Sequence, residues 1–254
     1  AMSAWSLDDL YPAYLAELDA FRAAVRAVAR AIVHAHLREA LAAQGVERFR
    51  ATASLFGARL VDYLLDLGDL TADGAACRAT TPLDDDPDAR AALDRYAAGG
   101  PRREALAWFL AACRDVAGGV LAGGDGLRLL RARDPRGLLA RWESVMLDAP
   151  ILAPCRALAA RALAAELDAP RVVFDGGAGV GVVLRTLLSD AALAPSLVNV
   201  RSYHFTELDP AILAMGRAAL ARRAPEPFAR ALRYRRRDLD VVARDPGAAG
   251  LARG

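Results

Sequence analysis

The chain has 254 residues, of which 55% are hydrophobic and 25% are charged, and its formal net charge is +2. A chain of this length can form one large domain or two small ones with a substantial buried core. Because acidic and basic residues are interspersed, bulk charge indicates neither a nucleic acid nor an anionic membrane as a partner.

Neither a membrane span nor a metal or disulfide framework is indicated. No apolar run reaches the about 18 residues of a membrane span. Acidic Asp8 and Asp9 stand where a signal peptide would be apolar, which predicts a cytoplasmic protein. The three cysteines, Cys77, Cys113 and Cys155, are far apart and lack a C-x-x-C spacing, so we expect them to be reduced.

Helical periodicity dominates the chain from about residue 6 to residue 165. Ser6 and Asp9 resemble a capping box, and Asp86 before Pro87 is typical of a helix start that Gly99 and Gly100 would end. The helices expected from these patterns cover residues 14–43, 87–98, 102–121 and 135–146.

The segment 54–82 breaks this pattern, because an amphipathic helix is followed by two short strands around Asp73-Gly74. A helix followed by such a wing-like hairpin can read DNA. Its helix carries Arg59 as the only base beside two aspartates, so phosphate contacts are disfavoured. We therefore expect a packing role and no nucleic-acid partner.

From residue 169 onwards the pattern changes to short β-branched runs that alternate with helices. Strands are expected at 171–174, 202–207 and 231–239, with helices near 180–188 and 210–222, and residues 189–200 read as a surface loop. Alternating strands and helices predict a parallel sheet with right-handed crossovers. Residues 1–168 and 169–254 are thus two domains.

A glycine-rich turn follows the first of these strands, in the pattern D-x-G-x-G-x-G formed by Asp175, Gly177, Gly179 and Gly181. Glycine lets a ligand approach the backbone closely and allows positive φ angles. In parallel sheets such a turn lies at the ligand crevice, beside the N-terminus of the next helix. The fingerprint of dinucleotide-binding proteins ends in glycine or alanine, whereas this chain has Val182 at that position. A nicotinamide cofactor is therefore the less favoured alternative.

Acidic residues end the two following strands. Glu207, in FTELDP, can accept hydrogen bonds from both hydroxyls of a ribose, whereas Asp209 before Pro210 is the better candidate for a helix cap. Asp238, in RRRDLD, can accept from the exocyclic amine of a base, although neighbouring arginines can also neutralise it. Three acids at the ends of three consecutive strands predict one nucleoside-binding crevice.

These motifs resemble the front half of a class I S-adenosylmethionine-dependent methyltransferase. FDGGAGVG is similar to its first motif, FTELDP to its second and RRRDLD to its third. The stretches YHFTELDP and RYRRRDLD are most similar to C-methyltransferase domains of modular polyketide synthases, including those of loading modules. The helical part resembles, more loosely, the lid regions of such enzymes.

The resemblance implies an α/β, Rossmann-like half-sheet preceded by a helical lid with a small hairpin. It also implies S-adenosylmethionine as cofactor. Asp175 and the backbone from Gly176 to Gly179, in the motif that ends at Gly181, would hold its methionine part. Glu207 would bind the ribose, and Asp238 with the backbone of Leu239 would address the adenine. An acyl thioester on an acyl carrier protein would be the substrate, with neighbouring synthase domains as further partners.

Only the segment LDVVARDPGAAGLARG follows Asp238, so later strands of a methyltransferase sheet are not expected and the first strand should be an open edge. The prediction is therefore a methyltransferase-type domain with a C-terminally shortened core. The alternative is a catalytically inactive, methyltransferase-like adaptor in a synthase loading module. Less favoured alternatives are a nicotinamide-dependent oxidoreductase and a winged-helix regulator.

No catalytic residue can be assigned from the sequence. His34 and His36 are two apart on a helix and face different directions, and His204 lies inside a strand, so packing or surface roles are expected for all three. Arginines near the third strand, Arg235 to Arg237, together with Arg222 and Arg223, could dock an acidic carrier protein. The alternative is a solvated strand face.

Overall fold

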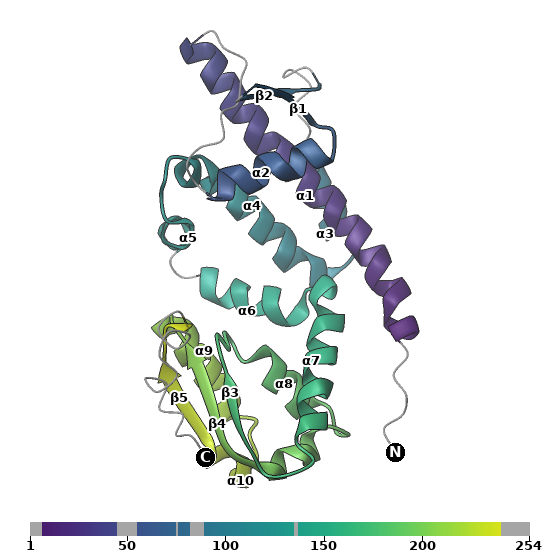
Figure 1. Ribbon diagram of the computed structural model, residues 1–254, viewed down its shortest axis with the longest axis vertical. Coiled ribbons are helices and arrows are strands. Elements are labelled where there is room, and N and C mark those ends of the chain that lie inside the picture. The colour runs from purple at the N-terminus through teal and green to yellow at the C-terminus, as the bar shows by residue number, and fades with distance from the viewer. Residues whose placement is uncertain (1–6, 45–54, 75, 82–88, 135–136, 240–254) are drawn as a thin grey trace. The chain divides into compact units, whose positions relative to one another are not determined.

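The structure is a computed structural model that describes residues 7–44, 55–74, 76–81, 89–134 and 137–239 (Figure 1). The chain divides into two compact units, residues 1–151 and 152–254. The sequence pattern placed a boundary at residues 168 and 169. Helix α7 (Ala153–Glu166) packs against α8 (Val182–Ser189), which is why the second unit begins earlier.

Helices build the first unit. The long helix α1 (Leu7–Gln44) packs against α3 (Ala89–Ala97) and α4 (Pro101–Leu121). Helix α4 also packs against α5 (Gly126–Arg133) and α6 (Leu138–Asp148). Small and branched apolar side chains fill the α1 side of this core, including Ala24, Val28, Val33 and Leu37.

Local signals explain where these helices begin. Gly100 has a φ angle of 133° and precedes Pro101, the first residue of α4, which is one residue before the helix start expected at residue 102. Helix α5 was not predicted, and its start is fixed by Asp125, whose side chain accepts a hydrogen bond from the backbone N–H of Arg128. The expected caps at Ser6 and at Asp86-Pro87, and the helix start at Pro135, lie outside the described residues.

The predicted helix and hairpin are present as α2 (Leu55–Asp66), β1 (Leu70–Asp73) and β2 (Ala76–Ala79), with the two strands antiparallel. The buried carboxylate of Asp69, between α2 and β1, accepts two hydrogen bonds from Arg26 of α1, at 2.7 and 2.8 Å. Arg30 lies 3.6 Å from the same carboxylate. These ion pairs attach the hairpin to α1, which agrees with the expected packing role.

A three-stranded parallel sheet forms the centre of the second unit, in the order β3-β4-β5. Its strands are β3 (Arg171–Asp175), β4 (Val200–Glu207) and β5 (Leu232–Arg236). Helix α8 follows β3, helix α9 (Pro210–Ala221) follows β4, and the short helix α10 (Glu226–Ala229) precedes β5. Among the described strands β3 is an edge strand, as predicted.

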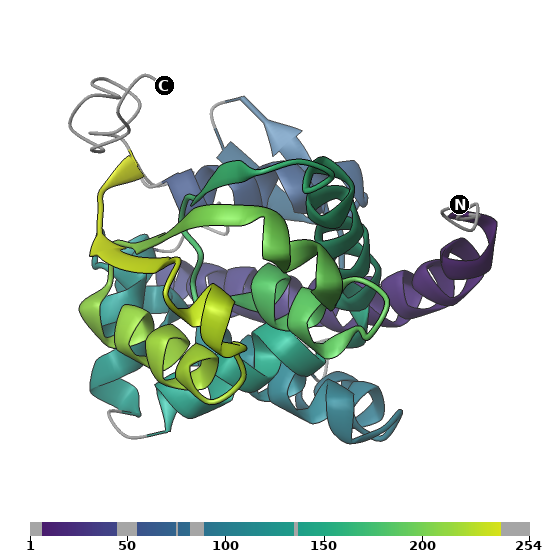
Figure 2. The same cartoon turned by 90° about the horizontal axis from the view of Figure 1, so that it is seen from below.

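The core of this unit lies on one face of the sheet, where α8 and α9 are found (Figure 2). Tyr203 and Phe205 of β4 point to this face and are almost fully buried, together with Leu184 and Leu187 of α8 and Leu220 of α9. Successive strand residues point to opposite faces, so Ser202, His204 and Thr206 occupy the other face.

Two details differ from the sequence prediction. Strand β5 was expected to run to residue 239, but it ends at Arg236. Strand β4 ends at Glu207 and the chain then turns into α9, so β5 has no neighbouring strand beyond this point. The last backbone hydrogen bond between the two segments runs from the N–H of Arg237 to the carbonyl of Glu207, at 3.1 Å. The expected loop at 189–200 contains the 3₁₀-helix η2 (Ala194–Asn199).

None of the described helices is long and apolar enough to cross a membrane.

Candidate functional site

The glycine turn lies between the end of β3 and the start of α8. Gly177, Gly179 and Gly181 have φ angles of 66°, 59° and 79°, in the left-handed region that side chains disfavour. A Cβ atom added to Gly177 or Gly179 would meet only one neighbouring atom within 4 Å, at 3.4 and 3.9 Å respectively. The turn therefore presents bare backbone, as the motif predicted.

Helix α9 closes tightly on this turn. A Cβ atom added to Gly216 of α9 would lie 2.7 Å from Cζ of Phe205 and 3.1 Å from the carbonyl oxygen of Gly179. The backbone N–H of Ala178 donates to the carbonyl of Thr206 at 2.8 Å, which ties the turn to β4. The shape of the turn is thus fixed by the sheet and by α9.

The carboxylate of Glu207 faces the glycine turn. Its Oε2 accepts a hydrogen bond from the backbone N–H of Gly179 at 3.1 Å. Its Oε1 accepts from the backbone N–H groups of Leu208 and Asp209, at 2.8 and 3.0 Å. A carboxylate has about four acceptor positions, so one position on Oε2 remains for a ligand hydroxyl. Asp209 caps α9 through the N–H groups of Ala211 and Ile212, as expected.

Asp175 lies beneath the turn and faces the core. Its Oδ2 accepts a hydrogen bond from the hydroxyl of Tyr203 at 2.8 Å, and its carbonyl accepts one from the hydroxyl of Thr206 at 2.8 Å. Burial raises the pKa of the Asp175 carboxyl, and the Tyr203 hydrogen bond partly offsets this rise. Asp175 thus anchors the turn to β4, and its contact with a cofactor stays a prediction.

We expect Tyr203→Phe to lower the free energy of unfolding by about 1 kcal/mol at neutral pH, because a buried carboxylate loses a hydrogen bond. Without this bond the pKa of Asp175 rises further. The folded state then binds its proton more tightly than the unfolded state does, so the extra loss should be small near pH 4 and grow as the pH rises. Urea unfolding across this range measures the difference, and a loss independent of pH would contradict the role of Asp175.

The predicted adenine-binding residues follow β5. Asp238 is exposed and lies two residues beyond the end of that strand. Leu239 reaches the glycine turn, because a Cβ atom added to Gly176 would lie 3.0 Å from Cδ2 of Leu239. The side chain of Leu239 remains 43% exposed and offers an apolar wall beside the turn.

The structure therefore brings Glu207, Leu239 and the turn from Gly176 to Gly181 together at the carboxyl ends of the strands. Sequence reasoning missed Tyr203 and Gly216. A glycine inside a helix costs about 1 kcal/mol relative to alanine, and this was the available signal for the close approach at Gly216. The Tyr203–Asp175 contact depends on the register of two parallel strands, for which the sequence holds no local signal.

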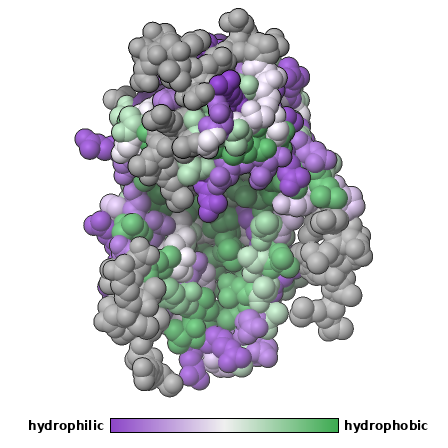
Figure 3. Space-filling view, turned by 45° about the horizontal axis from the view of Figure 1, so that its top comes forward, coloured by the Kyte–Doolittle hydropathy of each residue, from purple (hydrophilic) through white to green (hydrophobic). Residues whose placement is uncertain are grey.

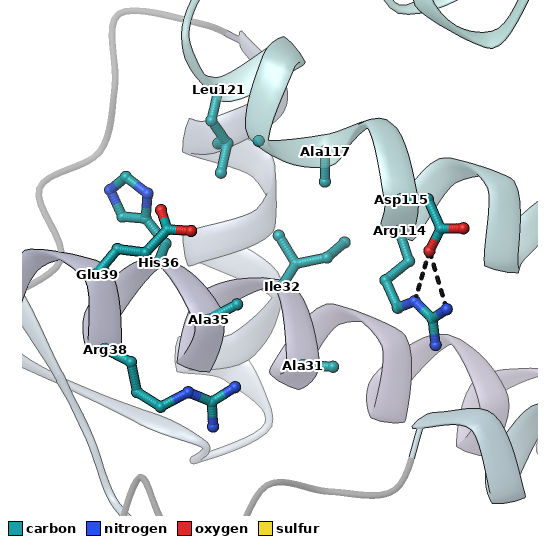
Figure 4. Close-up of a pocket in the computed structure, with 11 residues that line it drawn as sticks. Ala31, Ile32, Ala35, His36, Arg38, Glu39, Arg114, Asp115, Ala117 and Leu121 are labelled. Atoms are coloured by element: carbon teal, nitrogen blue, oxygen red, sulfur yellow. Dashed lines mark hydrogen bonds and ion pairs between the residues drawn. The ribbon is translucent and has the colours of Figure 1, made fainter. Parts of the chain in front are cut away.

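A separate hollow of about 450 Å³ lies between α1 and α4 of the first unit (Figure 4). Ile32 and Leu121 line its apolar part. His36 and Glu39 lie side by side on its rim, and Arg114 is paired with Asp115 at 2.9 Å. None of the residues predicted to bind the cofactor lines this hollow.

Comparison with known proteins gives matches among solved structures. No protein family matches the chain, and neither does any curated protein sequence. The chain is similar to the DszA carbon methyltransferase (TM-score 0.61, 20% identity), the CurJ carbon methyltransferase (0.67, 15%) and the CMeT domain of the citrinin polyketide synthase (0.59, 16%). These matches cover 95%, 95% and 91% of this chain and 64%, 65% and 66% of the other chains.

The chain thus spans slightly less than two thirds of the length of each of these structures. At these identities the similarity concerns the fold. It confirms, at that level, the resemblance indicated by the three motifs. The chain has the fold of class I methyltransferases, and within that fold it is similar to carbon methyltransferases, one of them from a polyketide synthase.

Proposed function

We propose that the second unit binds S-adenosylmethionine at the glycine turn and serves as a methyltransferase-type domain. The observation that carries this proposal is the hydrogen bond from Gly179 to Glu207. It joins the turn after β3 to the acid that ends β4, so that bare backbone and a ribose-binding carboxylate share one crevice. The similarity of the fold to carbon methyltransferases supports the same function.

The residues present fit this cofactor. At Gly177 and Gly179 the turn has no side chain that would block a methionine group, and Glu207 retains an acceptor position for a ribose hydroxyl. Leu239 would cover one side of the adenosyl group. Asp238 would accept a hydrogen bond from the exocyclic amine of the adenine. When bound, S-adenosylmethionine supplies an electrophilic methyl group. The chain would contribute orientation and exclusion of water.

We further propose that the methyl acceptor is an acyl thioester carried by an acyl carrier protein. A carbon nucleophile of this kind requires a group that helps to form the enolate. We assign formation of the enolate to none of the described side chains beside the glycine turn. The alternative, an inactive adaptor that keeps this fold, predicts a glycine turn that binds no cofactor.

Calorimetric titration with S-adenosylmethionine tests the proposed function. A dissociation constant in the micromolar range, corresponding to about 8 kcal/mol of binding free energy, is expected. Absence of a binding signal at high cofactor concentration would contradict the proposal and favour the adaptor. S-adenosylhomocysteine is a suitable second ligand, because it presents the same adenosyl group without the sulfonium charge.

Arginines near the end of β5 and of α9 could dock an acidic carrier protein. Arg223 and Arg236 are both exposed, and Arg236 also donates to the carbonyl of Leu208 at 2.9 Å. We expect Arg223→Glu combined with Arg236→Glu to weaken carrier-protein binding about tenfold at low salt, because two attractive contacts become repulsive. Fluorescence anisotropy with a labelled carrier protein measures this change. Unchanged binding would remove these arginines from the docking surface.

A further inference from the structure

The chain itself uses most of the acceptor positions on the Glu207 carboxylate. Each oxygen of a carboxylate has about two lone pairs that can accept a hydrogen bond. Both positions on Oε1 are taken, because this oxygen accepts from the backbone N–H groups of Leu208 and Asp209, at 2.8 and 3.0 Å. Oε2 accepts from the backbone N–H of Gly179 at 3.1 Å. One acceptor position, on Oε2, is therefore left for a ligand.

A ribose ring presents two neighbouring hydroxyls, on its 2′ and 3′ carbons. The place of Glu207 at the end of β4 predicted a carboxylate that accepts from both of them. With a single position left on Oε2, the carboxylate accepts from one hydroxyl. The other hydroxyl of the same ribose then has no acceptor on Glu207.

The bonds to Oε1 are local and fix the orientation of the carboxylate. Leu208 and Asp209 directly follow Glu207, and Asp209 is the N-cap of α9. Turning Oε1 toward a ligand would take the acceptor away from two backbone N–H groups, in a segment whose course is set by the start of α9. A second ribose hydroxyl would replace two hydrogen bonds by one, so we expect the carboxylate to keep its orientation.

The bond to Oε2 joins Gly179 to a residue 28 positions later in the chain. The φ angle of Gly179 is 59°, and a Cβ atom added to Gly216 of α9 would lie 3.1 Å from the Gly179 carbonyl oxygen. The turn therefore has little freedom to offer its N–H to another acceptor. If Oε2 released this N–H to accept from a second hydroxyl, one hydrogen bond would be lost for the one that is gained.

The second unit has many apolar side chains on its surface, and they gather in the lower half of the view in Figure 3. Leu208 and Leu239, which each follow an acid of the crevice, are 52% and 43% exposed. Neither side chain can accept a hydrogen bond. The carboxylate of Asp209 is directed to the N-terminus of α9 by the bonds that cap this helix. The second ribose hydroxyl is therefore expected to face solvent.

We propose that Glu207 recognises a single hydroxyl of the adenosyl ribose, so that the crevice also accepts a ligand that lacks the other hydroxyl. This inference rests on the proposed binding of S-adenosylmethionine and specifies which part of the cofactor the chain recognises. Of the 2′-deoxy and 3′-deoxy forms of an adenosyl ligand, one binds like the parent ligand and the other binds more weakly.

Calorimetric titration of the full chain with S-adenosylhomocysteine and with its 2′-deoxy and 3′-deoxy forms tests this proposal. We expect one deoxy form to bind within about twofold of the parent ligand. The other should bind about tenfold more weakly or worse, because a hydrogen bond to a charged acceptor is lost.

The other outcomes of this titration separate the two proposals. Tenfold losses with both deoxy forms would show that both hydroxyls are recognised, and losses with neither would show that Glu207 recognises no hydroxyl. Either result would overturn the inference while S-adenosylhomocysteine still binds. Failure of S-adenosylhomocysteine itself to bind would overturn the proposed function, and this inference with it.

Glu207→Gln shows whether the selectivity comes from this carboxylate. We expect the amide oxygen to stay with the N–H groups of Leu208 and Asp209, so that the amide NH₂ group, which cannot accept, faces the ligand. The affinities of the two deoxy forms should then differ by less than about threefold. Glu226→Gln makes the same change at an exposed ion pair with Arg230 and should keep the full difference. An undiminished difference in Glu207→Gln would overturn the proposal, because another group would then recognise the hydroxyl.

Discussion

Glu207→Ala should weaken S-adenosylmethionine binding about 100-fold, because a charged acceptor of a ribose hydroxyl is lost. The same substitution also removes the acceptor of the Gly179 N–H, so the turn loses its link to the end of β4. Glu207→Gln should lose nearly as much, since an amide keeps the shape but not the charge. Calorimetric titration of the three proteins measures the difference.

Glu226 of α10 provides the matched control for this experiment. Its side chain is 82% exposed, and it lies 3.4 Å from Arg230 in an exposed ion pair. Glu226→Ala makes the same chemical change outside the glycine turn and should bind the cofactor with unchanged affinity. If Glu207→Ala bound as tightly as Glu226→Ala, the ribose-binding role of Glu207 would be wrong.

Gly216→Val should lower the free energy of unfolding of the second unit by about 2 kcal/mol, because it forces side-chain atoms into a packed interface. A Cβ atom there overlaps the ring of Phe205, which is fully buried and cannot move aside without displacing the core. The same atom approaches the carbonyl of Gly179, so the glycine turn must shift as well. Cofactor binding should therefore fall together with stability.

Gly118→Val in α4 is the matched control, because it shows the effect of valine on helix propensity without the steric overlap expected at Gly216. Gly118 also lies inside a helix, but a Cβ atom added there would meet no atom within 4 Å. We expect this variant to unfold at a denaturant concentration equal to or higher than that of the parent chain. Equal destabilisation by the two valines would show that the approach of α9 to the turn contributes little.

The features of the second unit that follow from local chemistry could be predicted from the sequence. The alternation of β-branched runs and helices predicted the parallel sheet, and the spaced glycines predicted a turn with positive φ angles. The position of Glu207 at the end of a strand predicted that it would face this turn. In each case the residue type and its place at the end of an element were sufficient.

Features that depend on the tertiary structure could not be predicted. The register of β3 against β4 places Tyr203 beneath Asp175, and no local pattern encodes that register. The end of β5 depends on where β4 turns away, which is why Asp238 lies beyond the strand. The attachment of the hairpin to α1 joins Arg26 and Asp69, residues 43 positions apart. Such contacts are set by packing between elements.

Backbone amide NMR shifts on titration with S-adenosylhomocysteine test the central claim most directly, because they locate the bound ligand on the chain. We expect the largest shifts at Gly177, Gly179, Leu208 and Leu239, with little change at residues around the hollow between α1 and α4. Shifts confined to that hollow, or no shifts at saturating ligand, would contradict an adenosyl-binding crevice at the glycine turn.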